Sequence, residues 1–563
     1  VNDIPLPLDL VKAARFEEMG HMKGKIFKVV KKEEAWRVTG KAPISTKWVD
    51  TDKTHGTGEP MVRSRWVARD FKDPKDKDRE DLFSATPPLE MIRLMISRQA
   101  TLRSDGKERK TMYLDIKKAH LAPLCQSDVY VELPEEAGVE EDECGKLIHW
   151  LYGCRPAAQA WEEHYSALLV SNGFVRLKTV PVAFSHAERD LHGVVHGDDF
   201  VWVGLDDDLN WILEVLSKEY ELKNRGRLGS GREDVRRIDI LGRIVEWTEE
   251  GIKWSGDPRH QRILEEHFGM NADTKVLSKN GYDDDPEQDD PNDDLDKEEG
   301  KVFRGLAARL NYMAQDNVFI QFPAKEICKN MSKPTRHDFA KIKRIVRFLK
   351  GMGNLSLLYV WQSEEEAGKV MVYVDSDWAG CRTSRRSTSG GVMCVGRHVL
   401  RTWSCTQSTV ATSSGEAELI AMFEGATRGC GMQAILSEMG LLPSLSLLRV
   451  STDSSVAKSF VATRGVGKMR HLEVKLLWLQ EQVRNQRLRV LKVSGTANVA
   501  DALTKYHGLQ KLTELGRSFG IGVAVRAVDS AGPRGGVDGK GQPQPSGVGG
   551  LCLYDQRSPQ HCA

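Results

Sequence analysis

Short apolar runs alternate with amphipathic segments along most of the chain. Residues 370–374 (Val-Met-Val-Tyr-Val) predict a β-strand, and 391–395 (Gly-Val-Met-Cys-Val) predict its neighbour. Residues 416–425 predict a helix with Ser413–Ser414 as candidate N-caps. Residues 471–483 predict another helix, since Leu472, Leu476, Leu479 and Val483 would share one face. Strands mixed with helices in this way predict α/β and α+β layers.

Length and charge divide this pattern into regions. A chain of 563 residues predicts at least three folded units. Residues 282–299 hold eleven acidic residues and one lysine, too charged to fold, so we expect an acidic disordered insertion over 278–300. Although the whole chain has a net charge of only +1, the part outside 282–299 carries +11 and favours a polyanionic partner. Residues 523–563 are rich in Gly, Pro and Ser and predict a disordered tail.

Composition also narrows the class of protein. No apolar run approaches the roughly 20 residues of a membrane helix, so we expect no membrane role. Ten cysteines occur without a CxxC pair or zinc spacing, which indicates reduced thiols in an intracellular protein. The chain begins at Val1 without a signal peptide and is interpreted as a piece of a longer product.

Two acidic signals in the first half carry candidate chemistry. Asp115 ends the apolar run Tyr113-Leu114, and the pair Asp198-Asp199 lies between two apolar runs. An Asp pair in that setting is more often a plain hairpin turn. Together, however, carboxylates from neighbouring strands can hold two Mg²⁺ ions about 3.5–4 Å apart for phosphoryl transfer.

Several ordered blocks around these residues resemble the copia-type reverse transcriptases. The blocks are Thr46-Lys47-Trp48-Val49, Arg63 to Arg69, Leu114 to Leu121, Leu151-Tyr152-Gly153, Ala160-Trp161 and Gly197-Asp198-Asp199. The resemblance implies a right-hand polymerase with fingers, palm and thumb, in which Asp115, Asp198 and Asp199 are the catalytic metal ligands. It also implies that the nucleotide site includes Arg63, Arg65, Arg69, His120 and Gly153.

Three positions depart from the family pattern. His196-Gly197 stands where the family has Tyr-Val before the Asp pair. His120 stands where an aromatic residue screens the sugar of the incoming nucleotide, which predicts weaker rejection of ribonucleotides. Residues 154–159 (Cys-Arg-Pro-Ala-Ala-Gln) replace Leu-Lys-Gln-Ser-Pro-Arg, a change that affects template and nucleotide contacts.

The second half resembles the copia-type RNase H domain. Its blocks are Tyr373 to Gly380, Arg386 to Gly391, Thr409 to Glu418, Val450 to Ser454 and Asn498 to Lys505. Each acidic residue alone is more often a cap or turn carboxylate. The resemblance implies that Asp375, Glu418, Asp453 and Asp501 hold two Mg²⁺ ions, with Glu416 and Asp377 as lower-ranked alternatives.

The resemblance also gives domain boundaries. Residues 20–245 correspond to reverse transcriptase fingers and palm, 246–368 to thumb and connection, and 369–510 to the RNase H-like domain. Within the connection, Phe303 to Ala314 and Lys341 to Gly351 resemble the helices that precede RNase H. Basic residues on the second helix would follow a phosphate backbone or form a solvated face.

The implied function is an RNA-directed DNA polymerase with RNase H activity. Its cofactor would be Mg²⁺, two ions per active site, with Mn²⁺ as an alternative. Its partners would be an RNA template, a DNA primer, dNTPs, an RNA–DNA hybrid, and upstream capsid, protease and integrase parts of a polyprotein. The expected location is the cytoplasm, with virus-like particles or the nucleus as alternatives. Two alternative hypotheses are a non-catalytic nucleic-acid-binding remnant and a host-adopted RNase H.

Overall fold

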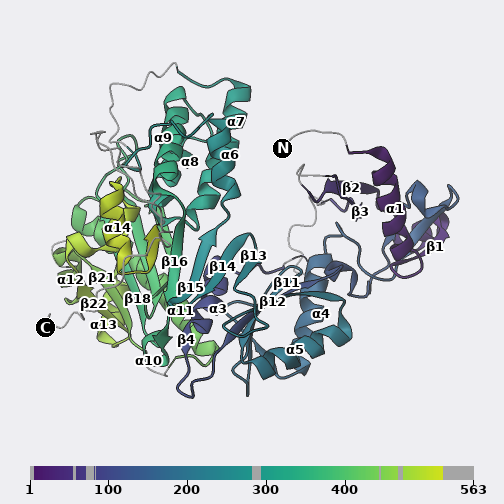
Figure 1. Ribbon diagram of the computed structural model, residues 1–563, viewed down its shortest axis with the longest axis horizontal. Coiled ribbons are helices and arrows are strands. Elements are labelled where there is room, and N and C mark those ends of the chain that lie inside the picture. Colours follow the sequence, from purple (N-terminus) through teal and green to yellow (C-terminus); the bar gives the residue numbers. More distant parts are fainter. Residues whose placement is uncertain are drawn as a thin grey trace, which may run out of the picture. The chain divides into compact units, whose positions relative to one another are not determined.

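The computed structural model describes residues 6–54, 59–71, 82, 84–281, 293–442, 446–466 and 473–523. The chain divides into two compact units, Val1–Val525 and Arg526–Ala563, and the second lies outside the described residues. The strands of the described part form six sheets, mixed with helices. A multidomain α/β and α+β architecture was predicted, and a mixed α/β arrangement is found (Figure 1).

The N-terminal elements form two small antiparallel sheets with two helices. A ribbon of β2 (Thr46–Asp52) and β3 (Val62–Ala68) packs against α1 (Leu8–Met22). The second sheet has the order β1-β7-β6 and carries the short helix α2 on β1 and β7. Its elements are β1 (Phe27–Lys31), α2 (Lys32–Thr39), β6 (Tyr130–Val131) and β7 (Glu143–Leu147).

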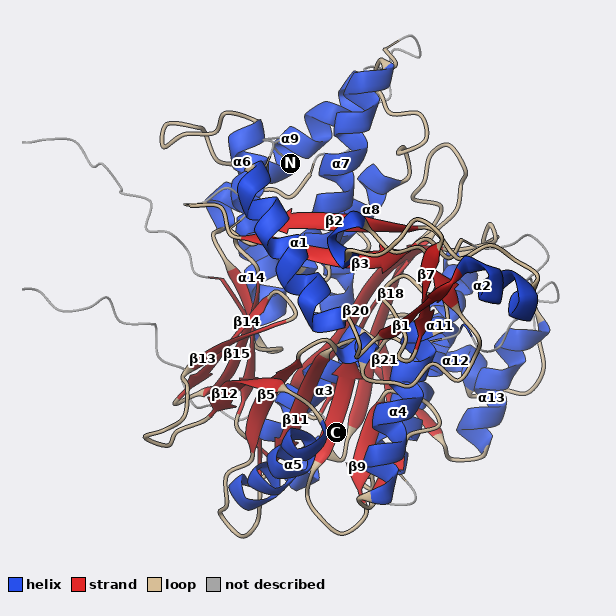
Figure 2. Ribbon diagram, turned by 90° about the vertical axis from the view of Figure 1, so that its right-hand side faces the viewer, coloured by secondary structure: helices blue, strands red, loops and turns tan. Residues whose placement is uncertain are grey.

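A six-stranded antiparallel sheet, of order β12-β5-β11-β10-β9-β8, follows (Figure 2). Alternate residues of its strands enter different cores because side chains alternate across a sheet. Tyr113 and Val201 pack with α3, whereas Leu114 and Phe200 pack with α4 and α5. The strands are β5 (Lys110–Ile116), β8 (Phe174–Arg176), β9 (Ala183–His186), β10 (His192–His196), β11 (Asp199–Gly204) and β12 (Leu222–Leu228). The helices are α3 (Leu89–Gln99), α4 (Ala157–Ser171) and α5 (Asp206–Glu219).

A five-stranded antiparallel sheet has the order β13-β14-β15-β16-β23. Helices α6 to α9 lie between β15 and β16 in the sequence. They contact one another, and Figure 1 shows them grouped together. The strands are β13 (Arg237–Ile240), β14 (Arg243–Thr248), β15 (Gly251–Gly256), β16 (Leu355–Val360) and β23 (Ile521–Val523). The helices are α6 (Arg259–His267), α7 (Lys297–Ala314), α8 (Gln321–Cys328) and α9 (Arg336–Met352).

The acidic insertion predicted over 278–300 overlaps structured residues at both ends. Asn280 is buried and donates to the Phe319 carbonyl. Asp296 caps α7 in a capping box with Glu299. Residues 282–292 lie outside the described residues, as do 524–563 of the predicted tail, while residues 521–523 form β23.

The last sheet is mixed, with the order β20-β19-β18-β21-β22. β18 pairs antiparallel with β19 and parallel with β21, and β21 pairs parallel with β22. The strands are β18 (Val370–Asp377), β19 (Thr388–Val395), β20 (His398–Thr406), β21 (Leu448–Thr452) and β22 (Leu488–Lys492). The helices of this region are α11 (Ser414–Glu438), α12 (Ser455–Val461), α13 (Leu477–Arg484) and α14 (Leu509–Arg517).

Helix α11 packs closely on β18. A Cβ at Gly425 would lie 2.5 Å from Val374 Cγ1, so only glycine allows this approach. The predicted strands at 370–374 and 391–395 are confirmed as paired strands, and Ser413 is confirmed as the N-cap of α11. The helix predicted over 471–483 starts later than expected. A 3₁₀ turn at Val474–Leu476 precedes α13, and residues 471–472 lie outside the described residues.

A short parallel pair joins distant parts of the chain. β4 (Thr101–Leu102) pairs with β17 (Gln362–Ser363), which leads into the short helix α10 (Glu364–Ala367). Beside this pair, Arg93 of α3 donates to the Leu400 carbonyl of β20 and to Asp316. The six-stranded sheet and the mixed sheet are therefore connected through α3.

Candidate active sites

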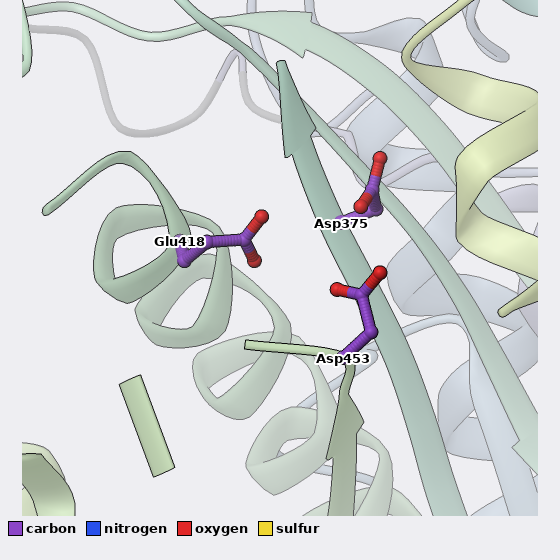
Figure 3. A group of neighbouring side chains, drawn as sticks. All are labelled: Asp375, Glu418 and Asp453. Atoms are coloured by element: carbon purple, nitrogen blue, oxygen red, sulfur yellow. The ribbon is translucent and has the colours of Figure 1, made fainter. Parts of the chain in front are cut away.

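Three carboxylates from the mixed sheet and helix α11 form one cluster. We call it the second acidic site (Asp375, Glu418 and Asp453), because another acidic site lies earlier in the chain. Each offers an oxygen, and these oxygens all lie within 4.8 Å of one another. Asp375 lies on β18, Glu418 on the first turns of α11, and Asp453 directly after β21. Figure 3 shows the three side chains close together, with the Glu418 carboxylate directed toward Asp375 and Asp453. The parallel pairing of β18 with β21 accounts for this, because it brings Asp375 and Asp453 to the same sheet end.

The electrostatics of the second acidic site favour a cation. Burial raises the pKa of Glu418 to about 8, and the charges of Asp375 and Asp453 add to the effect. Burial raises the pKa of Asp375 to about 6, against the opposing charge of Lys505. Among the described groups, Glu418 Oε2 is buried and has no hydrogen-bond partner. Crowded carboxylates with an unused oxygen fit a divalent metal ion such as Mg²⁺.

Asp501, the fourth predicted ligand, has its own cationic partners. Lys505 Nζ lies 2.5 Å from Asp501 Oδ1, and His507 Nε2 lies 3.0 Å from Asp501 Oδ2. Burial raises the pKa of Asp501, but hydrogen bonds from His507 and Lys505 outweigh it and lower the pKa to about 2. Lys505 Nζ also lies 3.6 Å from Asp375 Oδ2, so this ammonium joins Asp501 to the cluster.

Thr504, Lys505 and His507 contact these carboxylates, although the sequence did not predict a role for them. Thr504 donates its hydroxyl to Asp375 Oδ2, and Lys505 bridges two acids. Lys505 follows Asp501 by four residues, and the two side chains pair although Lys505 lies after the 3₁₀ turn Val499–Leu503. No sequence signal places His507, whose backbone is held through hydrogen bonds with Asn280, more than two hundred residues earlier.

The two lower-ranked acids have other contacts. Glu416 Oε2 accepts hydrogen bonds from the backbone N–H and the hydroxyl of Thr412, which closes the turn before α11. Asp377 accepts from the Thr388 backbone N–H across the β18–β19 pair. Both carboxylates thus stabilise backbone geometry next to the second acidic site.

Asp115, Asp198 and Asp199 form the first acidic site, on the six-stranded sheet. Asp199 on β11 stands directly opposite Asp115 on β5, so the two side chains share one face. Asp198 lies in the two-residue turn between His196 and Asp199. The Trp161 indole N–H of α4 donates to the Gly197 carbonyl at 2.7 Å and fixes this turn.

Neighbouring side chains already bind two of these carboxylates. The Tyr113 hydroxyl donates to Asp199 Oδ1 at 2.6 Å, and Arg225 donates to Asp115 Oδ2 at 2.6 Å. Burial raises the pKa of Asp199, and the charges of Asp198 and Asp115 add to this, against the Tyr113 hydrogen bond. Carboxylate oxygens are suitable ligands for Mg²⁺, and a guanidinium at Asp115 marks a place that attracts positive charge.

The predicted nucleotide-site residues gather partly around Tyr152. The Arg65 guanidinium lies 5.7 Å from the Tyr152 ring centre, and the His120 ring lies 6.2 Å from it. Burial lowers the pKa of His120, while the charge of Asp198 opposes this shift. At Gly153, with φ of +82°, a Cβ would lie 2.2 Å from the Ala68 carbonyl oxygen.

The other two predicted arginines lie on β3, the strand that also carries Arg65, or directly after it. Arg63 is on β3, opposite Thr51 of β2, and Arg69 follows β3 with its guanidinium 5.4 Å from the Phe71 ring centre.

The first half of the chain is similar to a known protein family. Residues 25–230 match the family model described as reverse transcriptase (RNA-dependent DNA polymerase). The matched range contains Asp115, Asp198 and Asp199, together with Arg225.

The chain is also similar to transposon polyproteins over most of its length. It is 26% identical to the retrovirus-related Pol polyprotein from transposon TNT 1-94 of Nicotiana tabacum, covering 88% of this chain and 36% of the relative. It is 23% identical to the corresponding polyprotein from transposon RE1 of Arabidopsis thaliana, covering 82% and 30%. The chain is thus related to retrotransposon Pol polyproteins, as its copia-type motifs predicted, and spans about a third of their length.

Among solved structures, the N-terminal RNase H domain of a Mycobacterium tuberculosis protein, fused to maltose-binding protein, is 17% identical. The alignment covers 27% of this chain and 97% of that chain, with a TM-score of 0.18. At this TM-score the likeness does not establish a shared fold. Within the described ranges, no helix has the length and apolar character needed to cross a membrane.

Proposed function

We propose that this chain is an RNA-directed DNA polymerase with RNase H activity, carried by two separate acidic sites. The observation that carries the proposal is the convergence of Asp375, Glu418 and Asp453 beside the mixed sheet, in a chain whose residues 25–230 match the reverse transcriptase family model. Each site brings together carboxylates from strands and from a neighbouring helix or turn, the convergence that phosphoryl transfer with two metal ions needs.

In the polymerase half, Asp115, Asp198 and Asp199 are proposed as metal ligands on the palm. The register of β5 against β11 supports this, because it puts Asp115 and Asp199 side by side. Arg63, Arg65, Arg69, His120 and Gly153 are proposed to form the nucleotide site on fingers and palm. Residues 20–245 would hold fingers and palm, and 246–368 the thumb and connection.

In residues 369–510, Asp375, Glu418, Asp453 and Asp501 are proposed as the RNase H ligands. When bound, two Mg²⁺ ions, or Mn²⁺ in their place, would supply the positive charge that activates a water and stabilises the scissile phosphate. Lys505 would neutralise Asp375 and Asp501 in the metal-free protein, since its ammonium contacts both. Thr504 would orient the Asp375 carboxylate through its hydrogen bond.

The proposed substrates are an RNA template with a DNA primer, dNTPs, and the RNA–DNA hybrid that copying produces. Because the relatives are polyproteins about three times as long, we propose that capsid, protease and integrase parts accompany this chain. The proposed location is the cytoplasm, with virus-like particles or the nucleus as alternatives.

Primer extension tests the polymerase half. The purified chain with Mg²⁺, an RNA template, a DNA primer and dNTPs should extend the primer. Asp198→Asn should abolish extension because it removes one ligand charge. The absence of extension by the parent chain would refute the polymerase proposal.

One observation favours a second candidate, an RNase H whose polymerase half is scaffold. Arg225 and Tyr113 bind two carboxylates of the first acidic site, whereas the second acidic site keeps an unused buried oxygen on Glu418. Cleavage of the RNA strand of a hybrid, without any primer extension, would support this candidate over the first.

A further inference from the structure

Arg225 reaches the first acidic site because of an irregularity in β12. Asn224 pairs with Leu114 of β5 and Arg227 with Met112, so Arg225 and Gly226 together stand opposite Tyr113. This is the pattern of a β-bulge, which changes the direction of a side chain and is frequent next to active sites.

Two further features hold the bulge in place. Gly226 has φ of +115°, a backbone conformation that residues with a Cβ rarely adopt. The Asn224 side chain accepts a hydrogen bond from the Gly226 N–H at 2.9 Å. The bulge is therefore part of the native backbone, and it directs Arg225 toward the carboxylates.

The Arg225 guanidinium binds Asp115 through the oxygen Oδ2, at 2.6 Å. The side chains are 42% exposed for Arg225 and 27% exposed for Asp115, so the pair lies at the surface of the site. A guanidinium keeps its charge at any physiological pH, so the pair can open only when the side chain rotates away. The exposure of Arg225 allows this rotation.

We propose that Arg225 is an internal counterion that competes with the metal ion for Asp115. The proposal rests on the proposed function, in which Asp115 is a metal ligand. In the metal-free protein, Arg225 offsets the repulsion between Asp115 and its acidic neighbours. Metal binding must displace Arg225, which lowers the affinity of the first acidic site. Arg225 is thus a positioning residue of the polymerase half.

The test measures Mn²⁺ binding to the full chain by the loss of the free Mn²⁺ signal in electron paramagnetic resonance. The second acidic site is silenced by Glu418→Gln and Asp453→Asn, so that binding reports on the first. In this background Arg225→Gln should tighten Mn²⁺ binding about fivefold, the effect expected for an exposed ion pair. Arg225→Lys keeps the charge and should bind close to the parent.

Arg227→Gln is the matched control, because Arg227 is on the same strand but bonds Asp206 and Asn210 instead. It should leave Mn²⁺ binding unchanged. If Asp115→Asn removes Mn²⁺ binding while Arg225→Gln binds no more tightly than the parent, the counterion proposal is wrong and the polymerase site stands. If Asp115→Asn has no effect on binding, the assignment of Asp115 as a ligand is wrong, and the counterion proposal falls with it.

Discussion

Replacing Asp316 by asparagine should destabilise the whole compact unit. The Asp316 carboxylate accepts hydrogen bonds from Arg93 and Arg243, both at 3.0 Å, and from the Trp254 indole at 2.9 Å. The side chains of Asp316, Arg93 and Arg243 are only 5%, 3% and 10% exposed. Asp316→Asn leaves the shape of the side chain almost unchanged but removes the negative charge that pairs with the buried guanidinium groups of Arg93 and Arg243.

Removing one partner of a buried ion pair costs about 3–5 kcal/mol. Arg93 keeps two carbonyl partners, those of Leu400 and Gln315, so we expect a loss near the lower end, about 3 kcal/mol. Thermal unfolding measures the effect, and a fall in Tm of about 3 °C is expected for a compact unit of this size. Asp128→Asn, which removes the exposed pair with Lys146, is the control. A Tm equal to that of the parent would refute the idea that this network joins α3 to the rest.

Further predictions concern pH, packing and the sites. Buried His398 has its pKa lowered to about 4 by burial, and its Nδ1 and Nε2 face Ser97 and the Val360 carbonyl. The unfolded state therefore takes up the proton first, so the free energy of unfolding should fall by up to about 3 kcal/mol between pH 6.5 and 4. Denaturant titrations at several pH values check this, and a His398→Gln variant that keeps the full pH dependence would contradict it. Gly425→Ala should lower Tm, because its Cβ would meet Val374 at 2.5 Å, whereas Gly431→Ala, with open space around it, should not. Trp161→Phe should reduce primer extension without altering hybrid cleavage, since only the turn at Gly197 loses a hydrogen bond; an equal loss of both activities would count against this.

The residues of the second acidic site could be named from sequence because each lies in a nearly continuous family motif. Their convergence depends on the β18–β21 parallel pairing, which links residues about eighty positions apart. The cationic surroundings were less visible. His507 is placed by Asn280, and Arg225 by a bulge whose backbone has no clear sequence signal beyond Gly226.

In residues 278–300, the composition and the helix-capping pattern indicated different structures. The acid-rich composition of 278–300 predicted disorder, yet Asp296 and Glu299 are three residues apart and form a capping box at the start of α7. β23 could not be predicted, because its pairing with β16 joins residues more than 150 positions apart. Its three residues have no pattern of their own.

The most direct test of two separate sites measures both activities in the same preparations of two variants. Asp198→Asn should lose primer extension and keep cleavage of the RNA strand in an RNA–DNA hybrid. Asp453→Asn should show the reverse, because the two carboxylates belong to different sheets. Loss of both activities in either folded variant, or of neither, would contradict the assignment of one active site to each sheet.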